Sequence, residues 1–273
     1  MAPGLSPLNE TLGVALHKLG IKSNGYVLKD VPERRCVSRH GDIVVKTFAL
    51  EEHDAWAREV AGVRALQSSG LTAHIVGSGE LWVATEWIEG ITPLSVEIDD
   101  DSIHQTLGAT LAKIHAASPI GLESWSVADR LAERLNKPPD GFPNELLVKI
   151  SNLSSGWKYF LKSQSFVHGD WGTANALVDP NNHANVLAVI DFEDSHIGDA
   201  LEDFRWQVFA GPSSSQLRNT LKGYAKELGA RASERMAFAA IELCLDTFNW
   251  DERIRKHSLQ ILQDFIDGWL PGV

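Results

Sequence analysis

The sequence predicts an α+β protein of two lobes, with a small antiparallel sheet and one helix in the first lobe and mainly helices in the larger second lobe. Two observations support this prediction. Short strand-like segments separated by turns fill the first third of the chain, whereas helical spacing of apolar residues dominates after Gly90. The chain of 273 residues is long enough for two lobes that each bury a core. We place the boundary between residues 1–86 and 87–273.

The first lobe is expected to contain three consecutive strands, a helix and a further strand. The three strands are expected at 26–31, from 36 onward, and at 43–48, with turns at 32–35 and 40–42. Trp56, Val60 and Val63 recur on one helical face, which predicts a helix over 51–68. A β segment over 81–85 ends the lobe.

The second lobe is expected to be mainly helical. Apolar residues recur at helical spacing from Ile103 to Ile114, and His115 lies on the apolar side of this helix, where we expect a packed core histidine. Residues 144–162 are expected to form another helix. Beyond Asp199 the helical pattern continues to the end of the chain.

The composition excludes several classes of function. A formal net charge of −11 gives no basic footprint for nucleic acid, whereas it is compatible with a cationic small molecule or with simple solubility. No apolar run reaches the ~20 residues of a membrane span, and the first residues lack a signal-peptide pattern. Cys36 and Cys244 stand far apart, as reduced thiols. We expect a cytoplasmic protein, either a monomer or a homodimer.

The most informative segment, 166–192, places polar side chains at the ends of short apolar strands. Asp170, Asn175 and Asp191 would carry a desolvation cost there, which indicates a chemical role. Segments 176–178 and 186–190 are typical of a hairpin centred near residue 183, which would place Asn175 opposite Asp191. A register slip of one residue would send one of these two side chains to the other face.

A carboxamide and a carboxylate side by side suit Mg²⁺, which prefers oxygen ligands together with substrate phosphates. Asp170 could accept a proton from an attacking hydroxyl, and this combination is typical of phosphoryl transfer. Two alternatives remain open. The three residues could be turn formers only, which their joint spacing disfavours. His168 and Asp170 could bind a hydrolytic metal, which the lack of further histidines in a comparable setting disfavours.

Phosphoryl transfer also requires a buried lysine on a strand, oriented by a carboxylate on the following helix. Lys46 lies inside the apolar strand 43–48, and Glu59 follows thirteen residues later on the inward face of its helix. An edge-strand lysine and a rim salt bridge are the alternatives. Because both residues occur in the expected order, we predict an ion pair between them.

These motifs together resemble the aminoglycoside phosphotransferase and choline-kinase-like branch of the protein-kinase-like fold. The residues that carry the resemblance are His168-Gly169-Asp170 with Asn175, Ile190-Asp191-Phe192, Gly198-Asp199 to Asp203, Val45-Lys46, Glu59 and 111–115. The resemblance covers roughly residues 26–206. It implies a two-lobed kinase that uses ATP or GTP together with Mg²⁺.

The resemblance also implies roles for the matching residues. Asp170 would be the catalytic base, and Asn175 and Asp191 would bind Mg²⁺. Lys46, held by Glu59, would contact the nucleotide phosphates. The backbone of a hinge would receive adenine at Thr85, Glu86, Trp87 and Ile88. Structural support of the catalytic loop would come from His168, Asp199 and Asp203.

The chain departs from the kinase pattern at two places. The turn 32–35 contains no glycine, although such enzymes usually cover the phosphates with a flexible loop; Arg34 or Arg35 could contact phosphate instead, or be solvated. Asp191-Phe192-Glu193 also lacks the glycine that permits an activation-segment switch, and no activation segment follows. Both departures favour a small-molecule enzyme over a regulated protein kinase.

The acceptor is expected to be a small, cationic molecule, such as an aminoglycoside or a similar antibiotic. Acidic and aromatic side chains could bind it through ion pairs and ring stacking. The candidates are Trp171, Glu193, Asp194, Glu202, Asp246, Trp250 and Asp251, with solvated or core positions as the alternative. Two other functions stay open: a metabolic kinase for choline, homoserine or an amino sugar, and a catalytically idle nucleotide-binding module.

Overall fold

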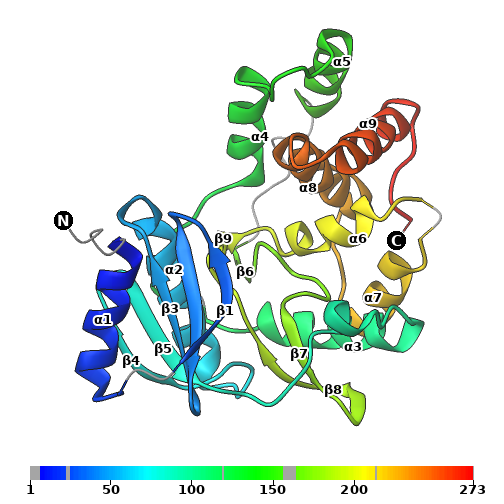
Figure 1. Cartoon of the computed structure of the whole chain (residues 1–273). Helices are drawn as coiled ribbons and strands as arrows, with labels where there is room; N and C mark the ends of the chain where they lie inside the picture. The colour runs from blue at the N-terminus through cyan, green and yellow to red at the C-terminus, as the bar shows by residue number, and fades with distance from the viewer. Residues whose placement is uncertain (1–6, 23–24, 119, 156–163, 213, 273) are drawn as a thin grey trace.

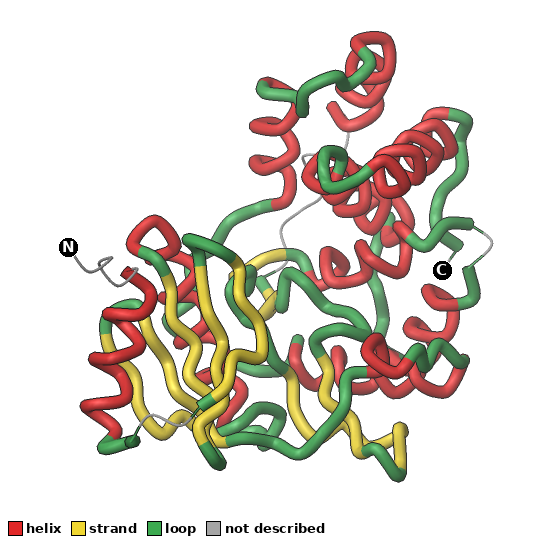
Figure 2. Tube along the Cα trace, in the orientation of Figure 1, coloured by secondary structure: helices red, strands yellow, loops and turns green. Residues whose placement is uncertain are grey.

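The computed structural model describes residues 7–22, 25–118, 120–155, 164–212 and 214–272. A five-stranded antiparallel sheet forms one side of the molecule, and most helices gather on the other side, as Figure 1 shows by element and Figure 2 by type of structure. The α+β class predicted from the sequence is confirmed. In the part of the chain that is described, no helix is long and apolar enough to cross a membrane.

The sheet of the first lobe has the strand order β1-β2-β3-β5-β4, and each neighbouring pair is antiparallel. Its strands are β1 (Tyr26–Val31), β2 (Arg35–His40), β3 (Ile43–Phe48), β4 (Ile75–Gly79) and β5 (Trp82–Glu86). Four of them correspond to expected strands. The strand β4 is not predicted from the sequence, because two of its five residues are glycines, which are uncommon in strands.

Two helices pack on opposite faces of this sheet. They are α1 (Pro7–Leu19) and α2 (His53–Gln67), and the short 3-10 helix η1 (Leu50–Glu52) precedes α2. Side chains alternate along β5, so Trp82 and Ala84 pack with α1 residues, whereas Val83 packs on the face that α2 covers. The expectation of a single helix in this lobe is therefore wrong, because the sheet has an apolar surface on both faces and each surface needs a cover.

The second lobe contains most of the helices, with α8 at its centre. These are α3 (Asp101–Ile114), α4 (Val127–Asn136), α5 (Asn144–Ser155), α6 (Arg205–Phe209), α7 (Gln216–Tyr224), α8 (Ala232–Thr247) and α9 (Glu252–Ile266), with the 3-10 helices η2 (Pro93–Val96) and η3 (Ala200–Phe204). Of the helix expected over 144–162, residues 156–162 lie outside the described residues. The lobe boundary at residue 86 coincides with the end of β5 and stays a proposal.

Two small antiparallel sheets flank the polar segment that the sequence singled out. They pair β6 (Ser165–Val167) with β9 (His196–Gly198), and β7 (Ala176–Asp179) with β8 (Asn182–Val189). The loop 168–175 joins β6 to β7, and the loop 190–195 joins β8 to β9. These two loops hold the three polar residues that the sequence singled out.

The register of the β7–β8 hairpin differs from the expected one. Ala176 pairs with Val189, and the N–H of Ile190 donates to the Asn175 carbonyl at 3.0 Å, so Asn175 lies level with Ile190. The expected pairing with Asp191 is wrong because the strands close through a tight turn at 180–181 and shift register twice. Asp191 has a φ of 68°, so its backbone leaves the extended conformation and the strand alternation ends there.

Candidate active site

Lys46 on β3 is buried, with 8% of its surface exposed, and its ammonium meets three carboxylates. Its Nζ lies 3.1 Å from Glu59 Oε2, 2.5 Å from Asp191 Oδ1 and 3.3 Å from Glu193 Oε2. The predicted ion pair between Lys46 and Glu59 is therefore present. It forms because Lys46 lies on the same face of β3 as Phe48, and α2 covers this face.

Glu59 also connects α2 to the segment that carries Asp191. Its Oε2 accepts a hydrogen bond from the Phe192 N–H at 2.6 Å. A Cβ at position 62 would lie 2.5 Å from the Phe192 Cβ, so Gly62 permits this close approach of the helix. One carboxylate thus fixes the lysine and the Asp191 segment relative to each other.

The charges in this cluster stabilise one another. Burial works against the charge of Lys46, but Asp191 and Glu59 more than offset it and hold the pKa of Lys46 above its usual value. Burial would likewise raise the pKa of Asp191, yet Lys46, through charge and hydrogen bond, holds this pKa well below the usual range. Asp191 is therefore ionised, as a metal ligand must be.

Asp170 is held from two sides in the loop after β6. Asn175 Nδ2 donates to Asp170 Oδ2 at 2.9 Å and to the Asp170 carbonyl at 2.7 Å. The indole Nε1 of Trp206, on α6, donates to Asp170 Oδ1 at 2.6 Å. Both carboxylate oxygens are thus oriented by neutral N–H donors. Trp206 is a site residue that the sequence did not predict, because nothing in its local pattern points to a carboxylate 36 residues earlier.

Burial raises the pKa of Asp170 above its ordinary value, although the Arg205 guanidinium and the Trp206 hydrogen bond act in the opposite direction. A carboxylate whose pKa is shifted toward neutral pH takes a hydroxyl proton more readily. The environment of Asp170 therefore suits a general base.

Asp203, on η3, anchors the loop that carries Asp170. It is fully buried, and its two oxygens accept the backbone N–H groups of His168 at 2.8 Å and Gly169 at 2.7 Å. His115 Nε2 lies 3.0 Å from Asp203 Oδ2. Burial opposes ionisation, but these hydrogen bonds, with that of His115 foremost, hold the pKa of Asp203 below its usual value. The side chains of Asp203 and His115 are thus buried partners, and the supporting role expected of Asp203 stays a prediction.

His168 and Gly169 shape the backbone just before Asp170. His168 Nε2 lies 3.0 Å from the Ile190 carbonyl, and its Nδ1 accepts the Asp170 N–H at 3.3 Å. Both ring nitrogens are therefore used within the protein, which argues against His168 as a ligand of a hydrolytic metal. Gly169 has a φ of 84°, and a Cβ there would collide with the Asp194 carbonyl.

Asp199 and Glu202 stabilise the segment before Asp203. Asp199 caps η3, and its Oδ2 lies 2.6 Å from Arg235 Nε on α8. Glu202 Oε1 accepts the Asp199 N–H at 2.9 Å, and its Oε2 lies 3.0 Å from His196 Nε2. Glu202 is only 3% exposed, so the expectation that it contacts the acceptor is wrong.

The next three acceptor candidates are Trp171, Glu193 and Asp194. Trp171 is completely buried, so it cannot stack on an acceptor, and this expectation is also wrong. Glu193 forms ion pairs with Lys46 and Arg35, which places it with the lysine cluster. Asp194 lies beside the Asp170 loop, because its backbone is the group that faces Gly169.

The three remaining acceptor candidates come from the end of the chain, and one of them, Trp250, lies beside Trp206. Trp250 is 61% exposed, and its ring centroid lies 6.1 Å from that of Trp206, so an aromatic surface extends from Asp170 toward solvent. Asp246 forms an ion pair with Arg134 of α4, whose side chain is 39% exposed. Asp251 caps α9 by accepting the Ile254 N–H at 2.8 Å.

The hinge that is expected to receive adenine consists of Thr85, Glu86, Trp87 and Ile88. The Glu86 N–H donates to the His74 carbonyl at 3.0 Å, and the Trp87 N–H donates to the Asp42 carbonyl at 2.8 Å. The Trp87 ring lies 4.0 Å from the Arg39 guanidinium. The segment is thus tied to the sheet, and its contact with adenine stays a prediction.

The donor set at the end of β8 fits a hard divalent cation. In the described part of the chain, no group of three or more His, Cys, Asp or Glu side chains is arranged to hold a metal ion. Mg²⁺ does not need such a group, because it is bound by one or two carboxylates plus substrate phosphates. Asp191 supplies an ionised carboxylate, and Asn175, which uses its Nδ2 on Asp170, keeps its amide oxygen available.

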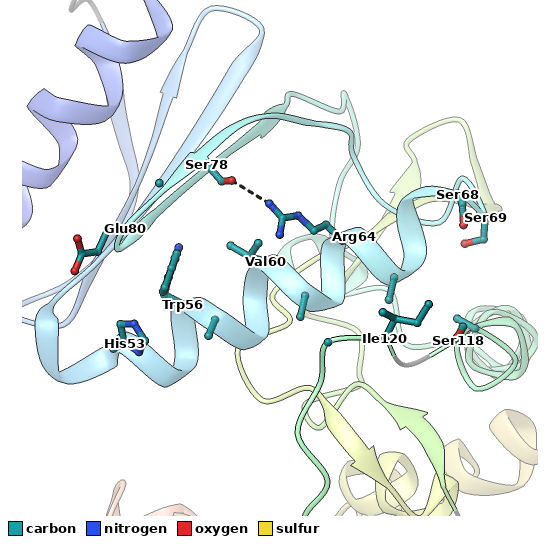
Figure 3. A pocket seen from close by; sticks show the side chains of 16 residues that line it. His53, Trp56, Val60, Arg64, Ser68, Ser69, Ser78, Glu80, Ser118 and Ile120 are labelled. Carbon is teal, nitrogen blue, oxygen red and sulfur yellow. Dashed lines mark hydrogen bonds between the residues drawn. The ribbon is translucent and has the colours of Figure 1, made fainter.

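A hollow of about 1020 Å³ lies on another side of α2 (Figure 3). It is lined by α2 residues such as Trp56 and Arg64, by Ser78 and Glu80, and by the segment after α3 that includes Ile120. Lys46, Asp170 and Asp191 are not among its lining residues. This hollow is therefore separate from the cluster of polar residues described above.

Residues 30–238 match the family model described as the phosphotransferase enzyme family. The chain belongs to this phosphotransferase family. The expectation of a phosphotransferase enzyme, which rested on Asp170, Asn175 and Asp191, is thereby confirmed. No curated protein sequence matches the chain significantly.

Solved structures with the same fold cover nearly the whole phosphotransferase. The GDP and kanamycin complex of APH(2″)-IIia matches with a TM-score of 0.73 at 14% identity, over 95% of this chain and 99% of the other. A choline/ethanolamine kinase family protein from Mesorhizobium loti matches with a TM-score of 0.69 at 15% identity, over 94% and 95%. Macrolide 2′-phosphotransferase MphH from Brachybacterium faecium matches with 0.64 at 16% identity, over 93% and 98%. At these identities the likeness establishes the fold alone.

Proposed function

We propose that this phosphotransferase moves the γ-phosphate of ATP, or of GTP, to a hydroxyl group of a small molecule. The observation that carries the proposal is a pair of side-chain clusters connected through the hydrogen-bonded segments 168–175 and 190–195. One cluster joins Lys46, Glu59 and Asp191, and the other orients Asp170 through Asn175 and Trp206. The family match supports the reaction class, and structural neighbours described as complexes with GDP or ATP support a nucleotide as donor.

Each cluster has its own task in this reaction. Lys46 neutralises phosphate charge and is kept in place by Glu59, as phosphoryl transfer requires. Asp170 accepts the hydroxyl proton of the acceptor, because its pKa is raised by burial and both of its oxygens are oriented. Asp191 and Asn175 would hold Mg²⁺, which supplies charge neutralisation on the phosphate oxygens when it is bound.

The acceptor that we propose is a cationic amino-sugar antibiotic of the aminoglycoside type. The net charge of −11 favours a cation, and structural neighbours are described as complexes with kanamycin and streptomycin. The exposed Trp250, next to Trp206, offers a surface for one sugar ring. Such an acceptor would place a hydroxyl at Asp170 while its ring rests on the aromatic surface.

One observation favours a second candidate, a metabolic acceptor that carries a carboxylate, of the homoserine kind. Asp246 is paired with Arg134, and the fully buried Glu242 is contacted by Arg130, Arg134 and Arg205. The negative charges of Asp246 and Glu242 are therefore neutralised by arginines. The half-exposed guanidinium of Arg134 would attract an acceptor that carries a carboxylate and would repel one that carries an ammonium group.

The experiment that tests both candidates is ADP release with Mg·ATP and a panel of acceptors. The panel contains kanamycin, streptomycin, erythromycin, choline and homoserine, with GTP as a second donor. Asp170→Asn is the control, because it keeps the shape of the side chain and removes the base. Turnover by the wild type that is absent from the control, with equal melting temperatures, is the expected result. If neither ADP from ATP nor GDP from GTP rises above the control with any acceptor, the proposed function is wrong.

A further inference from the structure

The turn that would cover the nucleotide phosphates is free of glycine and tied to its neighbours. The Arg34 N–H donates to the Val31 carbonyl at 3.0 Å, and the Ala49 N–H donates to the Arg34 carbonyl at 2.7 Å. The Arg34 Nε lies 2.7 Å from Glu52 Oε1. The turn is thus fastened to the segment after β3, and the side chain of Arg34 is directed to η1.

The other arginine of the turn is also engaged. Arg35 forms an ion pair with Glu193, and its side chain is only 14% exposed. Both turn arginines therefore already have carboxylate partners. Besides Lys46, the phosphates would then be complemented by a cation whose own ion pair is long, if this enzyme binds a nucleoside triphosphate as proposed.

A bulge in β1 changes the direction of Lys29. Val27 pairs with Ser38, and Lys29 pairs with Val37, so Leu28 is an extra residue on β1. Such a bulge shifts every following side chain to the other face of the strand. The side chain of Lys29 therefore lies on the opposite face of the sheet from the face it would occupy in a regular strand.

As a result of the bulge, the side chain of Lys29 lies on the same face of the sheet as that of Lys46. Val37 pairs with Lys46 on β3, and cross-strand partners share one face of the sheet. Without the bulge, Lys29 would pair with Cys36, whose side chain lies on the opposite face. The bulge thus places two lysines, Lys29 and Lys46, on the same side of the sheet.

Lys29 reaches the carboxylate that is expected to bind the metal. Its Nζ lies 3.4 Å from Asp191 Oδ2, while Lys46 holds Asp191 Oδ1 at 2.5 Å, and the Lys29 side chain is 58% exposed. The cluster is balanced in charge as it stands. Its carboxylates belong to Glu59, Asp191 and Glu193, and its cations to Lys29, Arg35 and Lys46.

We propose that Lys29 leaves Asp191 Oδ2 when the nucleotide binds and contacts the terminal phosphates, in place of a glycine-rich loop. If Asp191 holds Mg²⁺, the phosphates that share this ion would bring their negative charge beside Asp191. The Lys29 ammonium, 3.4 Å from Asp191 Oδ2, is the exposed cation next to that position. The exposure of Lys29 leaves its long side chain free to make this short movement. This inference rests on the proposed function.

The test measures binding of Mg·AMP-PNP, Mg·ADP and adenosine by calorimetry, without any acceptor. Lys29→Gln should lower the affinity for Mg·AMP-PNP by about tenfold, because a charge-assisted hydrogen bond is lost. The affinity for adenosine should not change. Lys29→Arg should restore most of the affinity. Binding of Mn²⁺ alone, followed by electron paramagnetic resonance, should become tighter in Lys29→Gln, because the competing ammonium is gone from Asp191.

Lys18→Gln, at an exposed position of α1 in the same lobe, is the matched control and should change none of these affinities. Unchanged Mg·AMP-PNP affinity in Lys29→Gln would overturn the inference, and so would an equal loss for adenosine. These results would leave the proposed function intact. Wild-type protein that fails to bind Mg·AMP-PNP would overturn the proposed function and this inference together.

Discussion

The indole N–H of Trp206 donates to Asp170 Oδ1 at 2.6 Å, across 36 residues of sequence. The amide of Asn175 holds the other oxygen, so the carboxylate plane has a defined orientation. Trp206 lies on α6, directly after η3 with its anchor Asp203. The same short stretch of chain therefore fixes both the loop backbone and the carboxylate that the loop presents.

Trp206→Phe removes the N–H donor and keeps an aromatic ring. We expect kcat to fall about tenfold or more, because a hydrogen bond to a charged group is lost, while KM for the nucleotide stays unchanged. The measurement is ADP release with the acceptor that the panel identifies. Trp56→Phe is the matched control, since the Trp56 indole donates at 3.2 Å to the carbonyl of Trp82 instead. Equal kcat values for the two variants would contradict a role for the Trp206 hydrogen bond.

The pH dependence of the reaction should report Asp170. Its raised pKa means that activity is lost as the pH falls through a value above the ordinary Asp range, because the base becomes protonated. The Trp206 hydrogen bond favours the ionised form, so Trp206→Phe should move this acid limb to higher pH. The profile of kcat/KM between pH 5 and 9 checks both statements. An acid limb at lower pH in the variant would refute the assignment of the limb to Asp170.

Asp203→Asn should destabilise the protein by about 3 kcal/mol or more, because a buried carboxylate with several donors is replaced by an amide. The pKa of Asp203 is depressed in the folded state, so its contribution is present above the unfolded pKa of about 3.9 and is lost as the pH falls below it. Urea unfolding at pH 7 and at pH 3 measures the difference, which should be smaller at pH 3.

Asp251→Asn serves as the control for Asp203→Asn. Asp251 is an exposed N-cap of α9, where Asn caps about as well as Asp, so stability should hardly change. If both variants lost the same stability, the special role of the buried Asp203 would be disproved.

Gly169→Ala should abolish activity and lower stability markedly. The position combines a φ of 84° with a collision between the added Cβ and the Asp194 carbonyl, so the loop before Asp170 must move. Thermal unfolding and ADP release are the measurements. Gly13→Ala is the matched control: nothing lies within 4 Å of its added Cβ in α1, so we expect a gain of about 0.5–1 kcal/mol. Full activity of Gly169→Ala would show that the loop does not need this conformation.

Local sequence patterns correctly predict a contact between two residues when each of them lies on a regular strand or helix. Strand alternation and helical periodicity together predict that Lys46 and Glu59 face each other, and the structure contains this ion pair. The helix α1, which was not predicted, has the same kind of signal, because Leu8, Leu12, Leu16 and Leu19 recur at helical spacing. The family membership of the chain followed from motifs of the same local kind.

Irregular backbone was the reason that other expectations failed. The β7–β8 hairpin shifts register twice, so Asn175 lies level with Ile190 and not with Asp191, the partner that a regular hairpin predicts. Trp171 and Glu202 looked like acceptor residues by their position in the sequence, yet the fold buries both. Burial and register depend on contacts between distant segments, which a single sequence does not display.

The sequence by itself determined the reaction class of this phosphotransferase and the polar residues around which its site is built, because these residues stand in short motifs at fixed spacing. Only the tertiary structure decided which side chains orient them. Trp206 reaches Asp170 through the packing of α6 against the loop, and Lys29 reaches Asp191 through a bulge in β1. Both contacts join segments far apart in the chain, the first within the second lobe and the second between the two lobes, so they form only when distant segments pack together.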